Sequence, residues 1–213
     1  MSTHSNPFTQ GGWSSSFGLN GDQRINPPSV YGALPMSTAP ATAGSSKKGA
    51  THFQFTNPNP TVLNSTVVGP HRDGTVHQLV RISTDERLAG YTTFTDVEGR
   101  SIALIEWTSG LPRVEVRSSV VKCSAGDWLK LSVDQNLGRP VRRMDVRGSR
   151  FVWCPNGDAL LLYSQAPGST PLVVATKHRN LVNLEMSDQA LSLGLLEPCI
   201  AAITLLLSGR RLE

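Results

Sequence analysis

The chain is poor in several residue types that define whole classes of protein. Of its 213 residues only 3 are Cys, 17% are charged and 6% are aromatic. So few cysteines exclude a scaffold built on disulfide bonds, and the composition as a whole excludes a coiled coil or a collagen-like repeat. No apolar run reaches the roughly 20 residues that a membrane-spanning helix needs, so no transmembrane segment is expected.

The first residues carry no basic segment followed by an apolar one, as a secretory signal would. Three well-separated cysteines without such a signal indicate free thiols in a reducing compartment, so we expect an intracellular, cytoplasmic protein. The net charge of +4 is below that of a dedicated nucleic-acid binder. The aromatic residues lie among aliphatic ones and not among Lys and Arg, so no nucleic-acid partner is expected.

The first 50 residues differ in composition from the rest. They hold nine Ser, seven Gly and five Pro, and they show no apolar periodicity. Such a segment buries too little surface to offset the entropy of ordering it, so residues 1–50 are predicted to be a disordered arm. Apolar positions within it, of which Phe8, Trp13 and Tyr31 are the candidates, could bind a partner; whether the arm orders on binding is left open.

Residues 51–213 are predicted to form one all-β domain. Twelve short runs are rich in β-branched and aromatic residues or alternate in polarity, and turn signals such as Asp73-Gly74 separate several of them. The runs are residues 52–56, 61–68, 75–82, 91–95, 101–107, 111–122, 128–131, 144–146, 151–153, 159–163, 172–175 and 181–186. About twelve strands at this spacing favour an antiparallel barrel or sandwich.

One helix is expected, near the end of the chain. Residues 199–207 are apolar on every helical face, with Pro198 suited to a first turn and Gly209 to a stop. Such a helix must be buried on all sides. Residues 195–208 would span about 21 Å, which is too short for a bilayer. We therefore predict a hydrophobic C-terminal helix along the axis of a closed barrel, with burial under one sheet face as the alternative.

Several motifs of the domain resemble those of an uncharacterised family of mushroom-forming fungi, a domain of unknown function related to the tubby C-terminal-like, LURP-one-related and phospholipid-scramblase barrels. The resemblance lies in residues 53–57, 59–64, 102–107, 146–148, 150–153 and 195–209, and residues 28–35 of the arm also look similar. It implies a twelve-stranded barrel around a central helix, in a family without established catalytic residues.

The sequence holds no pattern that points to catalysis. It has no Gly-x-Ser-x-Gly elbow, no phosphate-binding glycine loop and no histidine spacing typical of a metal site. His71 and His77 could meet across the Asp73-Gly74 turn, where a surface pair is the expected outcome. We therefore predict a protein that is not an enzyme and has no cofactor and no metal.

The most suggestive charged feature is a run of five arginines. Arg139, Arg142, Arg143, Arg147 and Arg150 lie within twelve residues, and Lys177 and Arg179 could extend the set. Guanidinium groups form paired hydrogen bonds with phosphate, so these side chains are a candidate anion or lipid site. Structural salt bridges, from Arg147 and Arg150 to Glu106 or Glu185, are the alternative.

Two functions follow from these observations. The leading hypothesis is a non-enzymatic intracellular binding protein whose partner is an unidentified protein. The alternative is peripheral binding to anionic lipid, such as a phosphoinositide head group, through the arginine-rich segment. The sequence leaves the oligomeric state open.

Overall fold

The computed structural model describes residues 49–58, 61–71, 73–85, 90–107, 110–134, 138–164, 170–179 and 181–213. The chain divides into two units, Met1–Gly44 and Ser45–Glu213, and the described residues all belong to the second. The predicted arm, with Phe8, Trp13 and Tyr31, lies outside the described residues apart from its last two positions.

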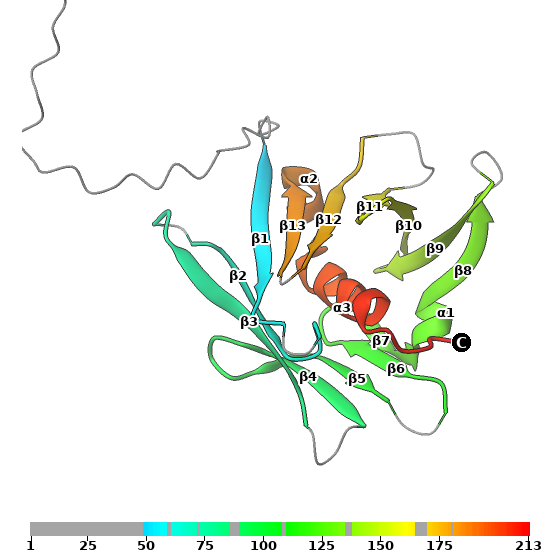
Figure 1. The fold of residues 1–213 in the computed structure, drawn as a ribbon, viewed down its shortest axis with the longest axis horizontal. Helices are drawn as coiled ribbons and strands as arrows, with labels where there is room; N and C mark the ends of the chain where they lie inside the picture. Colours follow the sequence, from blue (N-terminus) through cyan, green and yellow to red (C-terminus); the bar gives the residue numbers. More distant parts are fainter. Residues whose placement is uncertain are drawn as a thin grey trace, which may run out of the picture. The chain divides into compact units, whose positions relative to one another are not determined.

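Antiparallel strands make up most of the second unit, as predicted (Figure 1). Thirteen strands are found in the described part: β1 (Ala50–Thr56), β2 (Ser65–Pro70), β3 (Val76–Thr84), β4 (Tyr91–Asp96), β5 (Ser101–Glu106), β6 (Arg113–Val116), β7 (Val120–Ser124), β8 (Leu129–Asp134), β9 (Arg139–Val146), β10 (Ser149–Asn156), β11 (Ala159–Tyr163), β12 (Val173–His178) and β13 (Leu181–Ser187). The helices are α1 (Ala125–Trp128), α2 (Asp188–Ser192) and α3 (Leu196–Leu207).

Two details of the sequence prediction are wrong. The single strand expected over 111–122 is a hairpin, β6 and β7, whose turn is closed by the Ser119 N–H donating to the Val116 carbonyl. The expected single helix is accompanied by α1 and α2, and Trp128, expected in a strand, ends α1. With four and five residues, α1 and α2 are too short to leave a helical periodicity in the sequence.

All the strands belong to one sheet, in the order β7-β6-β5-β4-β3-β2-β1-β13-β12-β11-β10-β9-β8. Strands that follow one another in the chain are neighbours, except β7 and β8, which form the two edges of the sheet. In the middle of the sheet β1 pairs with β13, from Ala50↔Ser187 to Phe55↔Val182. The edge strands β7 and β8 are joined by α1, which packs against both. No ladder between β7 and β8 is found in the described part, so hydrogen bonds do not close the sheet there.

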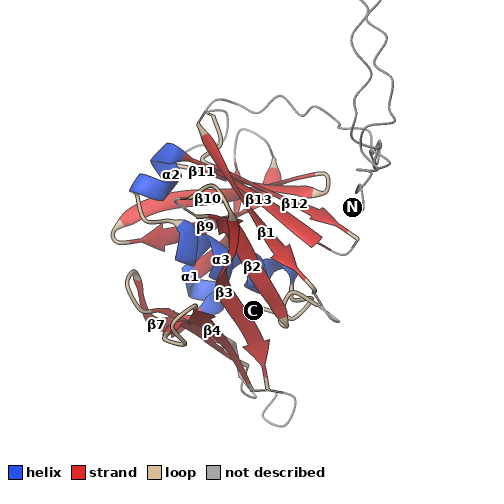
Figure 2. Cartoon of the chain, turned by 90° about the vertical axis from the view of Figure 1, so that its left-hand side faces the viewer, coloured by secondary structure: helices blue, strands red, loops and turns tan. Residues whose placement is uncertain are grey.

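The sheet curves around α3, with strands on several sides of the helix in both views (Figures 1 and 2). Helix residues 198–205 are all buried, as predicted. All of them except Pro198 and Thr204 belong to one core cluster with strand residues such as Phe55, Ile105 and Leu184. The Thr204 hydroxyl is satisfied within the helix, because it donates to the Ile200 carbonyl at 2.8 Å. Among the described helices, none has the length and apolar character needed to cross a membrane.

Candidate functional site

The five arginines of the predicted anion site are not gathered into one place. Arg147 occupies the two-residue turn between β9 and β10 with φ = 49°, and its Nε donates to the Ser118 carbonyl at 3.3 Å. Its guanidinium also lies against Gly194, just before α3. Arg142 lies near the other end of α3, where it lines a hollow with Leu205 and Leu206. Its Nη1 donates to the carbonyl of Leu129, in β8 (2.9 Å), and to Glu213 Oε1 (2.7 Å).

The remaining three arginines of the set, Arg139, Arg143 and Arg150, are exposed. Arg150 Nε lies 3.4 Å from Asp145 Oδ1, and both side chains are about two-thirds exposed. Neither Arg147 nor Arg150 forms the salt bridge to Glu106 or Glu185 that the sequence suggested. Lys122 bonds Glu106 and His52 lies beside Glu185 instead. Strand alternation and the hairpin turn separate side chains that are close in sequence.

A different set of cations surrounds the C-terminal end of α3. Arg142, Arg210 and Arg211 line a hollow of about 420 Å³ together with Leu205, Leu206, Leu212 and Glu213. The guanidinium carbon of Arg210 lies 4.6 Å from the centroid of the Trp107 ring. Lys177 and Arg179 line a second hollow, which includes Leu207 and Asp158. We call these five cations, Arg142, Lys177, Arg179, Arg210 and Arg211, the helix-end rim.

A separate groove lies where β1 and β2 part. β1 pairs with β13 over Ala50–Phe55, but with β2 only over Gln54–Thr56. Continuing that register would place His52 opposite Pro70, which has no N–H to donate. An irregularity between Val67 and Val68 also shifts β2 relative to β3. The β1–β2 ladder therefore stops at Gln54, although β1 itself continues to Ala50.

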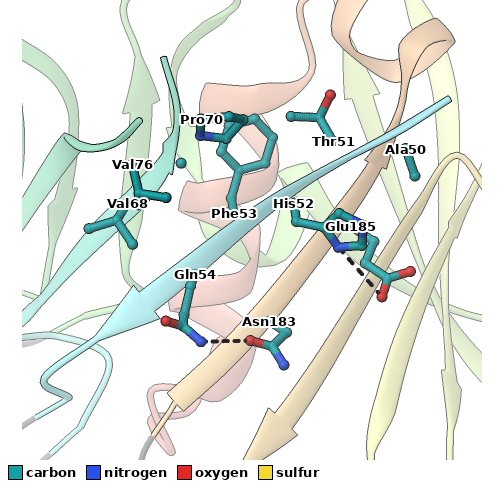
Figure 3. A pocket seen from close by; sticks show the side chains of 11 residues that line it. Ala50, Thr51, His52, Phe53, Gln54, Val68, Pro70, Val76, Asn183 and Glu185 are labelled. Atoms are coloured by element: carbon teal, nitrogen blue, oxygen red, sulfur yellow. Dashed lines mark hydrogen bonds and ion pairs between the residues drawn. The ribbon is translucent and has the colours of Figure 1, made fainter. Parts of the chain in front are cut away.

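This β1–β2 groove has a volume of about 610 Å³ and a mixed lining (Figure 3). Its apolar wall consists of Phe53, Val68, Pro70 and Val76, of which Val76 is 70% exposed. On the β13 side, Gln54 Nε2 donates to Asn183 Oδ1 at 3.0 Å, and His52 Nδ1 lies 3.8 Å from Glu185 Oε1. An apolar surface flanked by polar groups is the usual character of a binding site.

Gly69 gives the groove its shape. A Cβ atom at this position would lie 2.4 Å from Phe53 Cδ1 and 2.8 Å from Leu79 Cδ1. Only a residue without a side chain lets the Phe53 ring lie this close to the backbone of β2. The sequence signal for the groove was therefore Gly69-Pro70 at the end of a strand, a pair that is not among the predicted site residues.

The predicted meeting of His71 and His77 is confirmed, since their ring centroids are 4.8 Å apart. The carboxylate of Asp73, which the sequence analysis treated only as part of the turn, lies beside both rings. Hydrogen bonds lower the pKa of Asp73, the largest effect being that from the Thr75 side chain.

The three cysteines, all in the described part, are free and poorly suited to nucleophilic catalysis. Burial raises the pKa of Cys123, Cys154 and Cys199, with the strongest effect at the fully buried Cys199. The thiolate is the reactive form of cysteine, so a raised pKa lowers reactivity.

Comparison of the chain with protein-family models, curated proteins and solved structures finds no match. The resemblance to the fungal family therefore stays a prediction.

Proposed function

We propose that the chain is a non-catalytic binding module that captures an extended segment of a partner protein in the β1–β2 groove. The observation that carries this proposal is the early end of the β1–β2 ladder at Gln54, beside a hollow of about 610 Å³. A strand with an open side binds an extended peptide through main-chain hydrogen bonds, while neighbouring pockets select its side chains.

The backbone of β1 is oriented for this role. The Gly49 carbonyl accepts a hydrogen bond from the Asp188 N–H across the β1–β13 ladder. Hydrogen-bonding direction alternates along an antiparallel strand, so the N–H and C=O groups of Ala50 and His52 face β2 and the groove. An incoming strand would extend the ladder from Gln54 toward Ala50.

The lining indicates the chemistry of the bound segment. An aliphatic or aromatic side chain would cover Pro70 and Val76, the exposed part of the apolar wall. Glu185 is about half exposed and only loosely associated with His52, so it can pair with a cation of the ligand. Residues two apart in a strand share a face. We therefore infer a ligand that carries a large apolar residue with Lys or Arg two positions away.

A pair of matched valines tests this function. Peptides selected from a random display library on the full chain would be measured by fluorescence polarisation. Val76→Asp should weaken binding by roughly tenfold or more, because it places a carboxylate in the apolar wall. Val97→Asp alters an equally exposed valine (66%) outside the groove lining and should have no effect. Equal binding by the Val76→Asp protein would refute the proposal.

A second candidate function, binding of an anionic head group, is favoured by the helix-end rim. Arg142, Arg210 and Arg211 line one hollow, and Arg142 already holds the Glu213 carboxylate at 2.7 Å. Guanidinium groups that hold a carboxylate also suit phosphate. The tubby-type barrels that the sequence resembles bind phosphoinositides, which supports the same chemistry.

Co-sedimentation with phosphoinositide-containing liposomes tests this candidate. Replacing Arg210 and Arg211 by Ala should reduce binding, since each cation near an anionic membrane contributes about 1 kcal/mol. The matched control replaces Arg139 and Arg143 by Ala, because these exposed arginines do not line the rim hollows. A loss seen only in the control would favour the arginine-rich segment predicted from the sequence.

We also propose that the curved sheet works as a closed barrel, with α1 bridging its edges. Support comes from the packing of α1 against both β7 and β8 and from the burial of α3. A barrel filled by its own helix leaves its outer surface and rim for binding. A cytoplasmic location and membership of the fungal family are part of the same proposal.

A further inference from the structure

Two imidazoles and a carboxylate lie together between β2 and the start of β3, where hydrogen bonds join the described residues. The His71 N–H donates to the Thr75 carbonyl at 2.8 Å, and the Gly74 N–H donates to the His71 carbonyl at 3.0 Å. Gly74 has φ = 81°, a conformation that favours glycine. The Thr75 N–H donates to Asp73 Oδ1 at 2.9 Å, which fixes the carboxylate in the turn.

The side chains of the loop converge. His71 Nδ1 lies 3.3 Å from Asp73 Oδ1, and His77 Nε2 lies 3.8 Å from Asp73 Oδ2. Each of the three residues offers one potential ligand atom, an imidazole nitrogen or a carboxylate oxygen. These three atoms all lie within 4.8 Å of one another. All three side chains are about half exposed, so an ion can reach them from solvent.

These distances are close to those of a coordination shell. With metal–ligand bonds of 2.0–2.1 Å and tetrahedral angles, ligand atoms are about 3.3 Å apart. The separation of His71 Nδ1 and Asp73 Oδ1 already has this value, whereas His77 Nε2 lies 3.8 Å from the second oxygen, Oδ2, and would have to move closer to complete the shell. The Thr75 hydroxyl bonds Asp73 Oδ1 and His77 Nε2, so a metal ion that uses either atom must take the place of that hydrogen bond.

The donor set selects the type of metal. Imidazole suits zinc, copper, nickel and iron, whereas magnesium and calcium prefer shells of oxygen atoms. Three protein ligands leave a fourth tetrahedral position open. We propose that His71, Asp73 and His77 form a zinc site with one coordination position open to solvent. This site is independent of the proposed peptide groove, although Pro70 and Val76 of the groove are next to His71 and His77 in sequence.

Isothermal titration calorimetry of the full-length protein, without an affinity tag, tests the site with zinc chloride. One zinc ion per chain is expected, and magnesium chloride should give no binding heat. His71→Ala and His77→Ala should each weaken zinc binding by at least about tenfold, since even outer-shell substitutions at zinc sites cost 10–100-fold. The matched control is His178→Ala, at an exposed histidine outside the cluster.

Two further measurements distinguish a loss of zinc binding from a loss of folding. Native mass spectrometry counts bound zinc directly, and circular dichroism shows that each variant is folded. Zinc bound to the wild type and the His178→Ala variant, but lost from folded His71→Ala and His77→Ala proteins, would support the site. No zinc binding by the wild type at about 100 μM, or unchanged affinity in both cluster variants, would overturn it.

Discussion

Gly69 shows how a single residue shapes the candidate binding groove. Without a side chain on β2, the Phe53 ring can lie against the backbone, where any Cβ would meet it at 2.4 Å. Pro70 follows and cannot donate the hydrogen bond that would continue the ladder to β1. Two adjacent residues therefore end the β1–β2 pairing and supply part of the apolar wall.

Gly69→Ala should destabilise the protein. The added methyl group forces Phe53 and Leu79 to shift, and overpacking of this kind costs typically 1–3 kcal/mol. Urea denaturation followed by tryptophan fluorescence measures the change. Gly110→Ala is the matched control, since a Cβ there meets nothing within 4 Å. Equal stability of Gly69→Ala and wild type would mean that the Phe53 contact does not constrain the groove.

The arginine-rich segment shows what sequence reasoning misses at this scale. Arg142 and Arg147 are five positions apart in sequence, but they contact residues that follow and precede α3, respectively. Arg142 lies within β9 and Arg147 in the left-handed turn that follows it, so the extended strand between them holds the two side chains apart. The cations that join Arg142 in the helix-end rim come from residues 177–179 and 210–211, far away in the chain.

At the scale of elements, alternation of polarity predicted the strands well because one face of each is buried. β1 is an example, with Phe53 and Phe55 buried and Gln54 between them half-buried. The β6–β7 hairpin was missed because its turn, Arg117-Ser118-Ser119, contains neither Gly nor Pro. The C-terminal helix was predictable because its apolar surface has no solvent-facing side.

The close packing of α3 predicts that an enlarged side chain in this helix destabilises the protein. Ala202 is fully buried in the core cluster that joins the helix to the sheet. Ala202→Leu should lower the free energy of unfolding by about 1–3 kcal/mol, because a close-packed core has no room for three further carbon atoms. Thermal unfolding followed by circular dichroism measures the loss. Ala159→Leu, at a half-buried position of β11, should cost less; the reverse order would contradict the central position of α3.

At the scale of the whole molecule, the chain folds its strands around its own apolar helix. The interior is then occupied by residues such as Ile200, Ala201 and Ile203, so ligands must bind outside it. That β7 and β8 form the edges of the sheet was not predictable from the sequence, because the four-residue helix that links them leaves no helical periodicity. The β1–β2 groove was not predictable either. A polarity pattern indicates where a strand begins and ends, but the groove depends on where the pairing between β1 and β2 stops, which is within β1.

Amide hydrogen exchange, followed by NMR on the full chain with and without a selected peptide, tests whether a partner segment adds to the free side of β1. If a partner segment adds to β1, the N–H groups of Ala50 and His52 will exchange more slowly in the complex, because they face the groove and gain acceptors there. Gln54, already in the β1–β2 ladder, should change little. Protection confined to the helix-end rim, with Ala50 and His52 unchanged, would contradict the account.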